Sequence, residues 1–212
     1  HSLDRRQRQM CIRDSLWTLI DRLNADRPDL YGGGIWDHPQ LGAYYNAPGG
    51  RRGTAFTSRR RLAEQVAREV KSPSPTFNCV GPAGVGTGSL AGMRALHQLS
   101  SFAHIWPFDD PDTVSRPLHL VEIFPSYYFA LAGIKPVNGA HGERENINQA
   151  LACFGSDSVS ADFQANGPDH DEADALISAA ALRWFCSQSD FWSVPADAKA
   201  EGWIFGVKSA TS

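Results

Sequence analysis

The sequence of 212 residues predicts an α/β fold, in which short strands alternate with helices. Apolar residues recur at helical spacing in several segments, and short runs rich in apolar and β-branched residues lie between them. Loops rich in glycine and proline separate these segments. Strands that alternate with helices in this way are typical of a sheet covered by helices.

The first fifteen residues, HSLDRRQRQMCIRDS, are set apart from this prediction. They have neither helical nor strand periodicity, and no apolar run follows their arginines, which is unlike a signal peptide. Their back-translation resembles a widely used transposase sequencing adapter. We therefore expect residues 1–15 to be a disordered, adapter-derived artefact, and the protein itself to begin near Leu16.

The helices are predicted from the spacing of apolar residues. Leu16, Leu19, Ile20 and Leu23 share one helical face, and Pro28 ends that helix. Further helices are expected at residues 62–70, 89–102, 126–134, 144–154 and 169–188.

The strands are predicted from short apolar runs at residues 76–80 and 117–124, with a strand or extended tail at 201–207. The run 117–124, PLHLVEIF, is apolar nearly throughout, as in a strand that is covered on both faces. Residues 31–50 are rich in glycine and aromatic residues, and we expect an ordered loop there.

The composition limits the partners and the compartment. The net charge is −3, and residues 1–15 hold four of the 20 Lys and Arg but only two of the 23 Asp and Glu, so the remainder is more acidic. The whole chain therefore lacks the basic character typical of nucleic-acid-binding proteins. Beyond Cys11, the cysteines are Cys79, Cys153 and Cys186, whose odd number and wide spacing argue against disulfides and structural zinc. We expect a cytoplasmic protein without a membrane span.

Three carboxylates are candidates for chemistry. Glu122 lies within the apolar run 117–124, where an unpaired charge is costly. It is either a metal ligand or acid–base group, or it pairs with an arginine or lies on an exposed edge. Asp171 and Asp174 are one turn apart on a predicted helix, where two carboxylates can share Mg²⁺. Acidic residues in a first turn also favour the helix dipole without any ligand, and the spacing alone favours that explanation.

Two further segments could bind phosphate. GPAGVGTGSL joins a predicted strand to a helix, but Thr87 stands where a Walker loop has lysine, so a tight turn is the simpler interpretation. Five arginines cluster around Phe56: Arg51, Arg52, Arg59, Arg60 and Arg61. With that aromatic residue they either track a phosphate backbone or form a solvated helix start.

Six short motifs occur in a fixed order: KSPSPTF, GPAGVGTGSLAGMRAL, IWPFD, EIFPS, DEADALISAAAL and EGWIF. In that order, from about Leu16 to Val207, the chain resembles the domain of unknown function 429 family of predicted nucleases. The DEADAL segment is also similar to the DxxDA helix of Holliday-junction resolvases. The resemblance implies a ribonuclease-H-like mixed sheet flanked by helices, in one domain over residues 16–212.

The resemblance also implies an activity and a site. The activity would be hydrolysis of phosphodiesters in nucleic acid with Mg²⁺ or Mn²⁺. The residues implied as catalytic metal ligands are Glu122, Asp171 and Asp174. Those implied for phosphate or nucleic acid are Lys71, Ser72, Gly84, Gly86 and Ser89, together with Arg59 and Arg60 of the arginine cluster.

The resemblance further predicts that the chain is incomplete. Folds of this kind begin with a strand that carries an aspartate, followed by two further strands, and family members have a second acidic strand before the region that begins here at Leu16. We therefore expect an N-terminally truncated domain that lacks part of its metal site, is unstable or inactive, and has an exposed strand edge. Two other functions stay open: a non-catalytic nucleic-acid-binding or scaffolding domain, and a phosphotransferase or ATPase.

Overall fold

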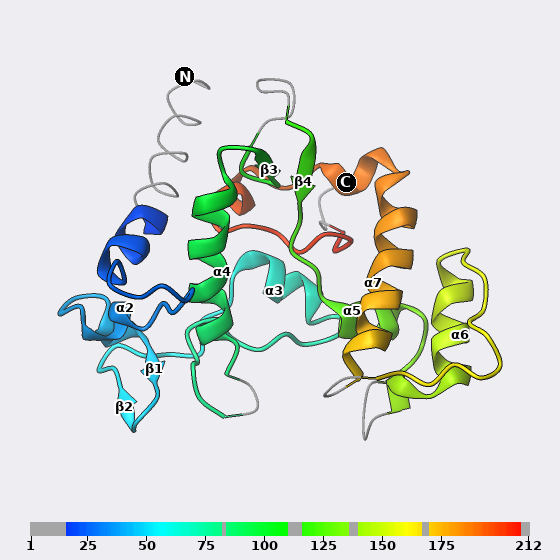
Figure 1. Ribbon diagram of the computed structural model, residues 1–212, viewed down its shortest axis with the longest axis horizontal. Helices are drawn as coiled ribbons and strands as arrows, with labels where there is room; N and C mark the ends of the chain where they lie inside the picture. Colours follow the sequence, from blue (N-terminus) through cyan, green and yellow to red (C-terminus); the bar gives the residue numbers. More distant parts are fainter. Residues whose placement is uncertain (1–15, 82–83, 110–115, 136–139, 167–169, 209–212) are drawn as a thin grey trace. The chain divides into compact units, whose positions relative to one another are not determined.

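A computed structural model describes residues 16–81, 84–109, 116–135, 140–166 and 170–208 (Figure 1). The adapter-like residues 1–15 lie outside the described residues. The chain divides into two compact units, each assembled from separate stretches of sequence. Unit 1 consists of His1–Leu62, Ser74–Leu120 and Ala196–Gly202; unit 2 consists of Ala63–Pro73, Val121–Pro195 and Trp203–Ser212. Helices and two small sheets make the structure a mixed α/β one, as the sequence predicts. The single domain stays a prediction.

Unit 1 begins with a helix over residues 16–23 and continues through short elements. These elements are α2 (Gly34–Asp37), η1 (Gly42–Tyr44), β1 (Asn46–Ala47), β2 (Arg51–Arg52), α4 (Gly86–Leu99), β3 (Ala103–Ile105), β4 (Leu118–Leu120) and η5 (Ala196–Ala200). β1 pairs with β2 in antiparallel fashion, and β3 pairs with β4 in parallel. Ile20, Ile35 and Leu90 form the centre of a core between the first helix, α2 and α4.

The first helix buries Ile20 and packs Leu23 against the core as predicted, but it buries Trp17 in place of Leu16. Trp17 and Ile20 are buried, whereas Leu16 is 38% exposed. Asn24 explains where the helix ends: its side-chain amide donates to the Ile20 carbonyl at 2.7 Å, and its oxygen accepts the Gly34 amide at 2.8 Å. A polar side chain thus satisfies backbone groups that would otherwise be left unpaired at the helix end.

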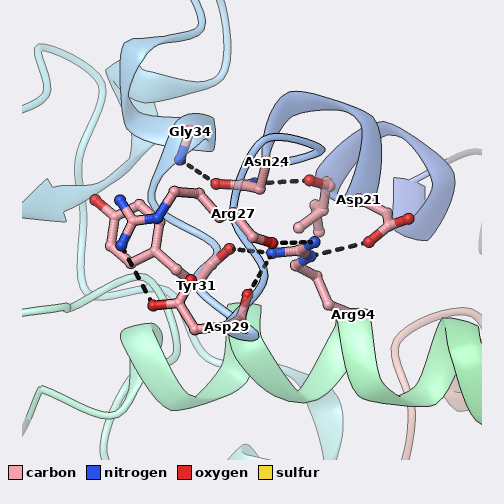
Figure 2. A network of polar contacts seen from close by, with 8 residues as sticks. Asp21, Asn24, Arg27, Asp29, Tyr31, Gly34 and Arg94 are labelled. Carbon is pink, nitrogen blue, oxygen red and sulfur yellow. Dashed lines mark hydrogen bonds and ion pairs between the residues drawn. The ribbon is translucent and has the colours of Figure 1, made fainter.

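A buried arginine holds the loop that follows this helix. Arg94 of α4 is 5% exposed and forms an ion pair with Asp21 at 2.9 Å (Figure 2). Its guanidinium also donates to the carbonyls of Asp29 and Tyr31, at 2.9 and 2.8 Å. Every one of these partners comes from residues 21–31, so a single side chain fixes the path of that segment.

Two strand predictions are wrong in extent. Within the predicted buried strand 117–124 only Leu118–Leu120 is a strand, and Leu118 is 50% exposed. β3 is the buried strand of the pair, and β4, which pairs with it, is largely exposed to solvent. Residues 76–80 contribute one bridge, between Asn78 and Asn46, because the chain turns where the Asn78 amide donates to the Pro75 carbonyl.

Unit 2 is mostly helical. Its elements are α3 (Leu62–Ala67, whose first residue belongs to unit 1), α5 (Pro125–Leu131), η2 (Ala140–Gly142), α6 (Arg144–Cys153), α7 (Asp171–Cys186) and η4 (Ser189–Trp192). α7 packs against α5 and α6 (Figure 1). These helices confirm the sequence prediction, although α3 is shorter than expected. None of the described helices is long and apolar enough to cross a membrane.

The segment 203–207 completes the core of unit 2. Trp203, Ile204 and Phe205 are each at most 2% exposed. The Phe205 amide donates to the Glu122 carbonyl at 2.9 Å, and the Tyr128 hydroxyl donates to the Phe205 carbonyl at 2.7 Å. The predicted extended tail is therefore a central part of this unit.

Candidate nucleic-acid interface and the predicted carboxylate site

A hairpin over residues 42–56 presents much of the arginine cluster. Beyond the β1–β2 pairs, the Gly53 amide donates to the Tyr45 carbonyl at 2.8 Å and the Ala55 amide donates to the Ala43 carbonyl at 2.9 Å. The turn contains Gly49 and Gly50 at φ +76° and +74°. Two consecutive residues in this left-handed region favour glycine, because a side chain would be strained there.

The two tyrosines of the hairpin face opposite ways. Burial raises the pKa of Tyr45 to about 12, and its ring lies 5.2 Å from that of Phe77. The preceding residue in the sequence, Tyr44, is 40% exposed. Gly53 permits the close pairing of the two arms, since a Cβ there would fall 2.1 Å from the Ala43 carbonyl oxygen. The hairpin thus anchors one face in unit 1 and leaves the other to solvent.

Three arginines lie over aromatic rings in this region. Each guanidinium carbon lies near one ring centroid: Arg51 at 5.8 Å from Trp36, Arg52 at 4.7 Å from Phe56, and Arg59 at 5.4 Å from Tyr44. All three arginines are exposed. We call these six residues the arginine–aromatic surface.

The arginines of this surface differ in their other contacts. Arg51 forms an ion pair with Asp37 at 2.6 Å, so part of its charge is compensated. Arg59 donates from Nε to the Thr57 hydroxyl at 3.1 Å. Arg52 has no ion pair or side-chain hydrogen bond among the described residues, and its polar groups face solvent. Donors for an anionic ligand are therefore concentrated on Arg52 and Arg59.

The other two arginines of the cluster, Arg60 and Arg61, interact within the protein. Arg61 donates to the Glu201 carbonyl at 3.4 Å, and the Glu201 carboxylate accepts the Leu62 amide at 2.9 Å. Arg60 is less exposed than Arg59 and also interacts within the structure. The cluster is thus neither a plain solvated helix start nor five equivalent phosphate-binding groups.

The predicted carboxylates do not meet at one point. Glu122 is exposed and lies after β4, joined to Ile204 by a single bridge, so the prediction of a carboxylate inside a buried strand is wrong. A run of apolar letters cannot distinguish a covered strand from one that leaves its faces in solvent. Glu122 acts electrostatically on Tyr128, and it is not among the groups that act on Asp174.

Asp171 and Asp174 lie together in the first turn of α7, next to two histidines. Burial raises the pKa of the Asp174 carboxyl, His141 lowers it, Asp171 raises it and His170 lowers it, so burial prevails. The rings of His141 and His170 are 5.1 Å apart and nearly perpendicular. His170 has φ +64°, and its ring occupies the space that a Cβ on Gly142 would fill.

The described side chains do not form the three-carboxylate group that the resemblance implies. No group of three or more His, Cys, Asp or Glu side chains that could hold an ion occurs in the part of the chain that the structure describes. Proteins commonly hold Mg²⁺ by one or two carboxylates while water or substrate phosphate completes its octahedral coordination, so Asp171 and Asp174 would need such further oxygens. Glu172, the third acidic residue of this first turn, accepts from the Asn166 amide at 2.9 Å, and Asp169 lies outside the described residues.

The glycine-rich loop uses its own amides. The Gly84 amide donates to the Gly81 carbonyl at 2.9 Å, and the Gly86 amide donates to the Asn78 carbonyl at 2.8 Å. A Cβ at Gly86 would meet the Thr76 carbonyl at 2.4 Å, so close packing accounts for this glycine. The Ser89 amide is bonded within the start of α4. A tight turn and helix start therefore explain the loop.

The KS pair follows the turn in which α3 ends. The Lys71 amide donates to the Ala67 carbonyl at 2.9 Å, and Ser72 is exposed. Unit 2 holds this pair together with the three carboxylates, and unit 1 holds the glycine-rich loop and the arginines.

Sequence reasoning did not identify four residues that matter here. They are Trp36 and Tyr44, whose rings lie under arginine guanidinium groups, and His141 and His170, which lie near Asp174. The alternation of Tyr44 and Tyr45 beside the arginines was the available signal for one of them. Comparison of the chain with family models, curated proteins and solved structures finds no match.

Proposed function

We propose that the protein binds nucleic acid through the arginine–aromatic surface. The observation that carries the proposal is the placement of three exposed arginines over three rings in one region of unit 1. Guanidinium groups bind phosphates and aromatic rings stack on bases, so the combination suits nucleic acid better than a simple polyanion. The acidic net charge of the chain does not oppose this, because salt screens exposed charges beyond about 10 Å.

The test is titration of a fluorescent oligonucleotide, followed by anisotropy at several salt concentrations. Because residues 1–15 contain four arginines, the reference chain carries glutamine at Arg5, Arg6, Arg8 and Arg13. We expect Arg52→Ala with Arg59→Ala to weaken binding and to reduce the salt slope by about 1.4, as two lost phosphate contacts on a single strand should.

The matched control removes the same charge elsewhere. Arg22 and Arg68 are exposed and lie over no ring among the described residues. Arg22→Ala with Arg68→Ala should leave the affinity of the reference chain nearly unchanged. Equal losses in both double variants, or no binding by the reference chain, would refute the proposal.

A second candidate function is that of a ribonuclease-H-like nuclease, which the motif order suggests. The observation in its favour is the half-buried Asp174 beside Asp171, with His141 and His170 as additional acid–base groups. Asp171 and Asp174 would be the ligands from this chain, with water or substrate phosphate completing the coordination of the metal, and we derive no step through it. The ribonuclease-H-like fold belongs to this same proposal.

The nuclease proposal is tested by cleavage of labelled single-stranded and duplex DNA and RNA, with Mg²⁺, with Mn²⁺ and with EDTA. Asp174→Asn should abolish any cleavage, whereas Asp157→Asn should not, since Asp157 is exposed and lies outside α7. Cleavage that persists in Asp174→Asn would exclude this site.

A further inference from the structure

Two rings of the arginine–aromatic surface lie on neighbouring arms of the hairpin. Tyr44 and Phe56 belong to the two arms of the hairpin, which the Ala55 amide joins to the Ala43 carbonyl at 2.9 Å. Arg59 lies over the ring of Tyr44 and Arg52 over that of Phe56. The exposed face of the hairpin therefore holds two neighbouring ring–guanidinium pairs. Trp36 and Arg51 form a third pair, but Arg51 precedes Arg52 in β2, so its side chain points to the opposite face of the strand.

Such pairs suit unpaired bases. Aromatic rings and guanidinium planes both stack on bases whose faces are accessible, whereas the base faces of a duplex are covered by their neighbours. Duplex readers place a helix or a two-stranded ribbon in the major groove. The strands β1 and β2 have two residues each, and the side chains of β2, Arg51 and Arg52, already lie over rings.

Charge alone gives this surface limited affinity. Arg51 is compensated by Asp37, which leaves Arg52 and Arg59 as the main uncompensated cations. Two phosphate contacts supply a small salt-dependent contribution. Stacking must therefore provide much of the binding free energy if the surface is to hold a strand.

We propose that the arginine–aromatic surface binds single-stranded nucleic acid by stacking unpaired bases on its ring–guanidinium pairs, while Arg52 and Arg59 contact the phosphates. This inference rests on the proposed function, and it adds the class of nucleic acid and the way in which it is held. It predicts that removing the bases from a single strand weakens binding, and that the added charge of a complementary strand does not compensate for covered base faces.

The experiment compares three probes on the reference chain at one salt concentration: a deoxythymidine oligonucleotide, an abasic strand of equal length, and a duplex of equal length. We expect the deoxythymidine strand to bind about tenfold more tightly than the abasic strand, because stacking of even one base contributes that much. The duplex should bind no more tightly than the abasic strand.

Two variants locate the effect. Arg52→Lys with Arg59→Lys keeps the charge and removes the planar groups, and Tyr44→Leu removes an exposed ring. Both should weaken binding of the deoxythymidine strand about fivefold or more and leave the abasic strand unchanged. Thermal melting checks that each variant is folded, and Tyr44→Phe, which retains the ring, should bind as the reference chain does.

The outcomes separate the two proposals. Equal binding of all three probes, with losses in the alanine variants but not in the lysine variants, would overturn the stacking inference and leave nucleic-acid binding intact. Preference for the duplex would also overturn it. Absence of binding to every probe would refute both proposals together.

Discussion

Arg94 and Arg52 have the same side chain in opposite surroundings, one buried in the fold and the other exposed to solvent. Arg94 is buried, and its donors are used by Asp21 and by backbone carbonyls. Arg52 is exposed and contacts the ring of Phe56 at 4.7 Å. An arginine whose donors are used inside the chain stabilises the fold, whereas one held over a ring with its donors in solvent is available to a ligand.

The largest expected effect is on Arg94. Arg94→Met leaves Asp21 and the carbonyls of residues 27–31 without their donor, and breaking a buried pair in this way costs about 3–5 kcal/mol. The free energy of unfolding of the reference chain in urea measures it. Arg52→Met, the matched control, should change that free energy by less than about 0.5 kcal/mol. Similar losses in both variants would remove the distinction between the two arginines.

A smaller effect is expected at the partner of Arg94. Asp21→Asn keeps an acceptor for the 2.9 Å contact but removes its charge, and the Asp21 side chain is 35% exposed. We expect a loss of about 1 kcal/mol in the free energy of unfolding, less than for Arg94→Met, because the carbonyl acceptors remain. A loss as large as that of Arg94→Met would mean that the ion pair, and not the carbonyl contacts, holds the loop.

The smallest effect concerns Asp174, a half-buried carboxylate whose pKa is raised mainly by burial. Its folded pKa lies above the ordinary value of about 3.9, so its ionisation lowers stability as the pH rises through the folded pKa. Asp174→Asn should therefore stabilise unit 2 by less than about 1 kcal/mol near pH 7, with no gain near pH 3. Urea unfolding at both pH values measures this, and a gain that is larger at pH 3 would contradict it.

The helices could be predicted because their information is local. The apolar spacing of residues 169–188 predicts α7, and the proximity of Asp171 to Asp174 follows from the helical repeat. The exposure of β4 could not be predicted, because it depends on which segment covers each face. The histidines near Asp174 include His141, which comes from η2 and has no spacing relation to α7.

Arg94 shows what a sequence pattern leaves ambiguous. It stands four residues after the buried Leu90, on the same face of α4, where an arginine is usually assumed to reach solvent. Its partners are carbonyls of the loop 27–31, and no side-chain pattern records where carbonyls will point. The rings beneath Arg52 and Arg59 were partly visible in sequence, since Phe56 lies within the cluster.

The segment 203–207 has a consequence for the synthesis of the protein. The Phe205 amide donates to the Glu122 carbonyl, and the Phe205 carbonyl accepts the Tyr128 hydroxyl. Gly206, whose φ is +88°, lies against the ring of Phe185. While a ribosome is still translating residues 121–195, the nascent helices have no Trp203, Ile204 or Phe205 to cover their apolar faces. Unit 2 therefore completes its core only after residue 207 has left the exit tunnel, and until then the apolar faces that this segment covers stay exposed.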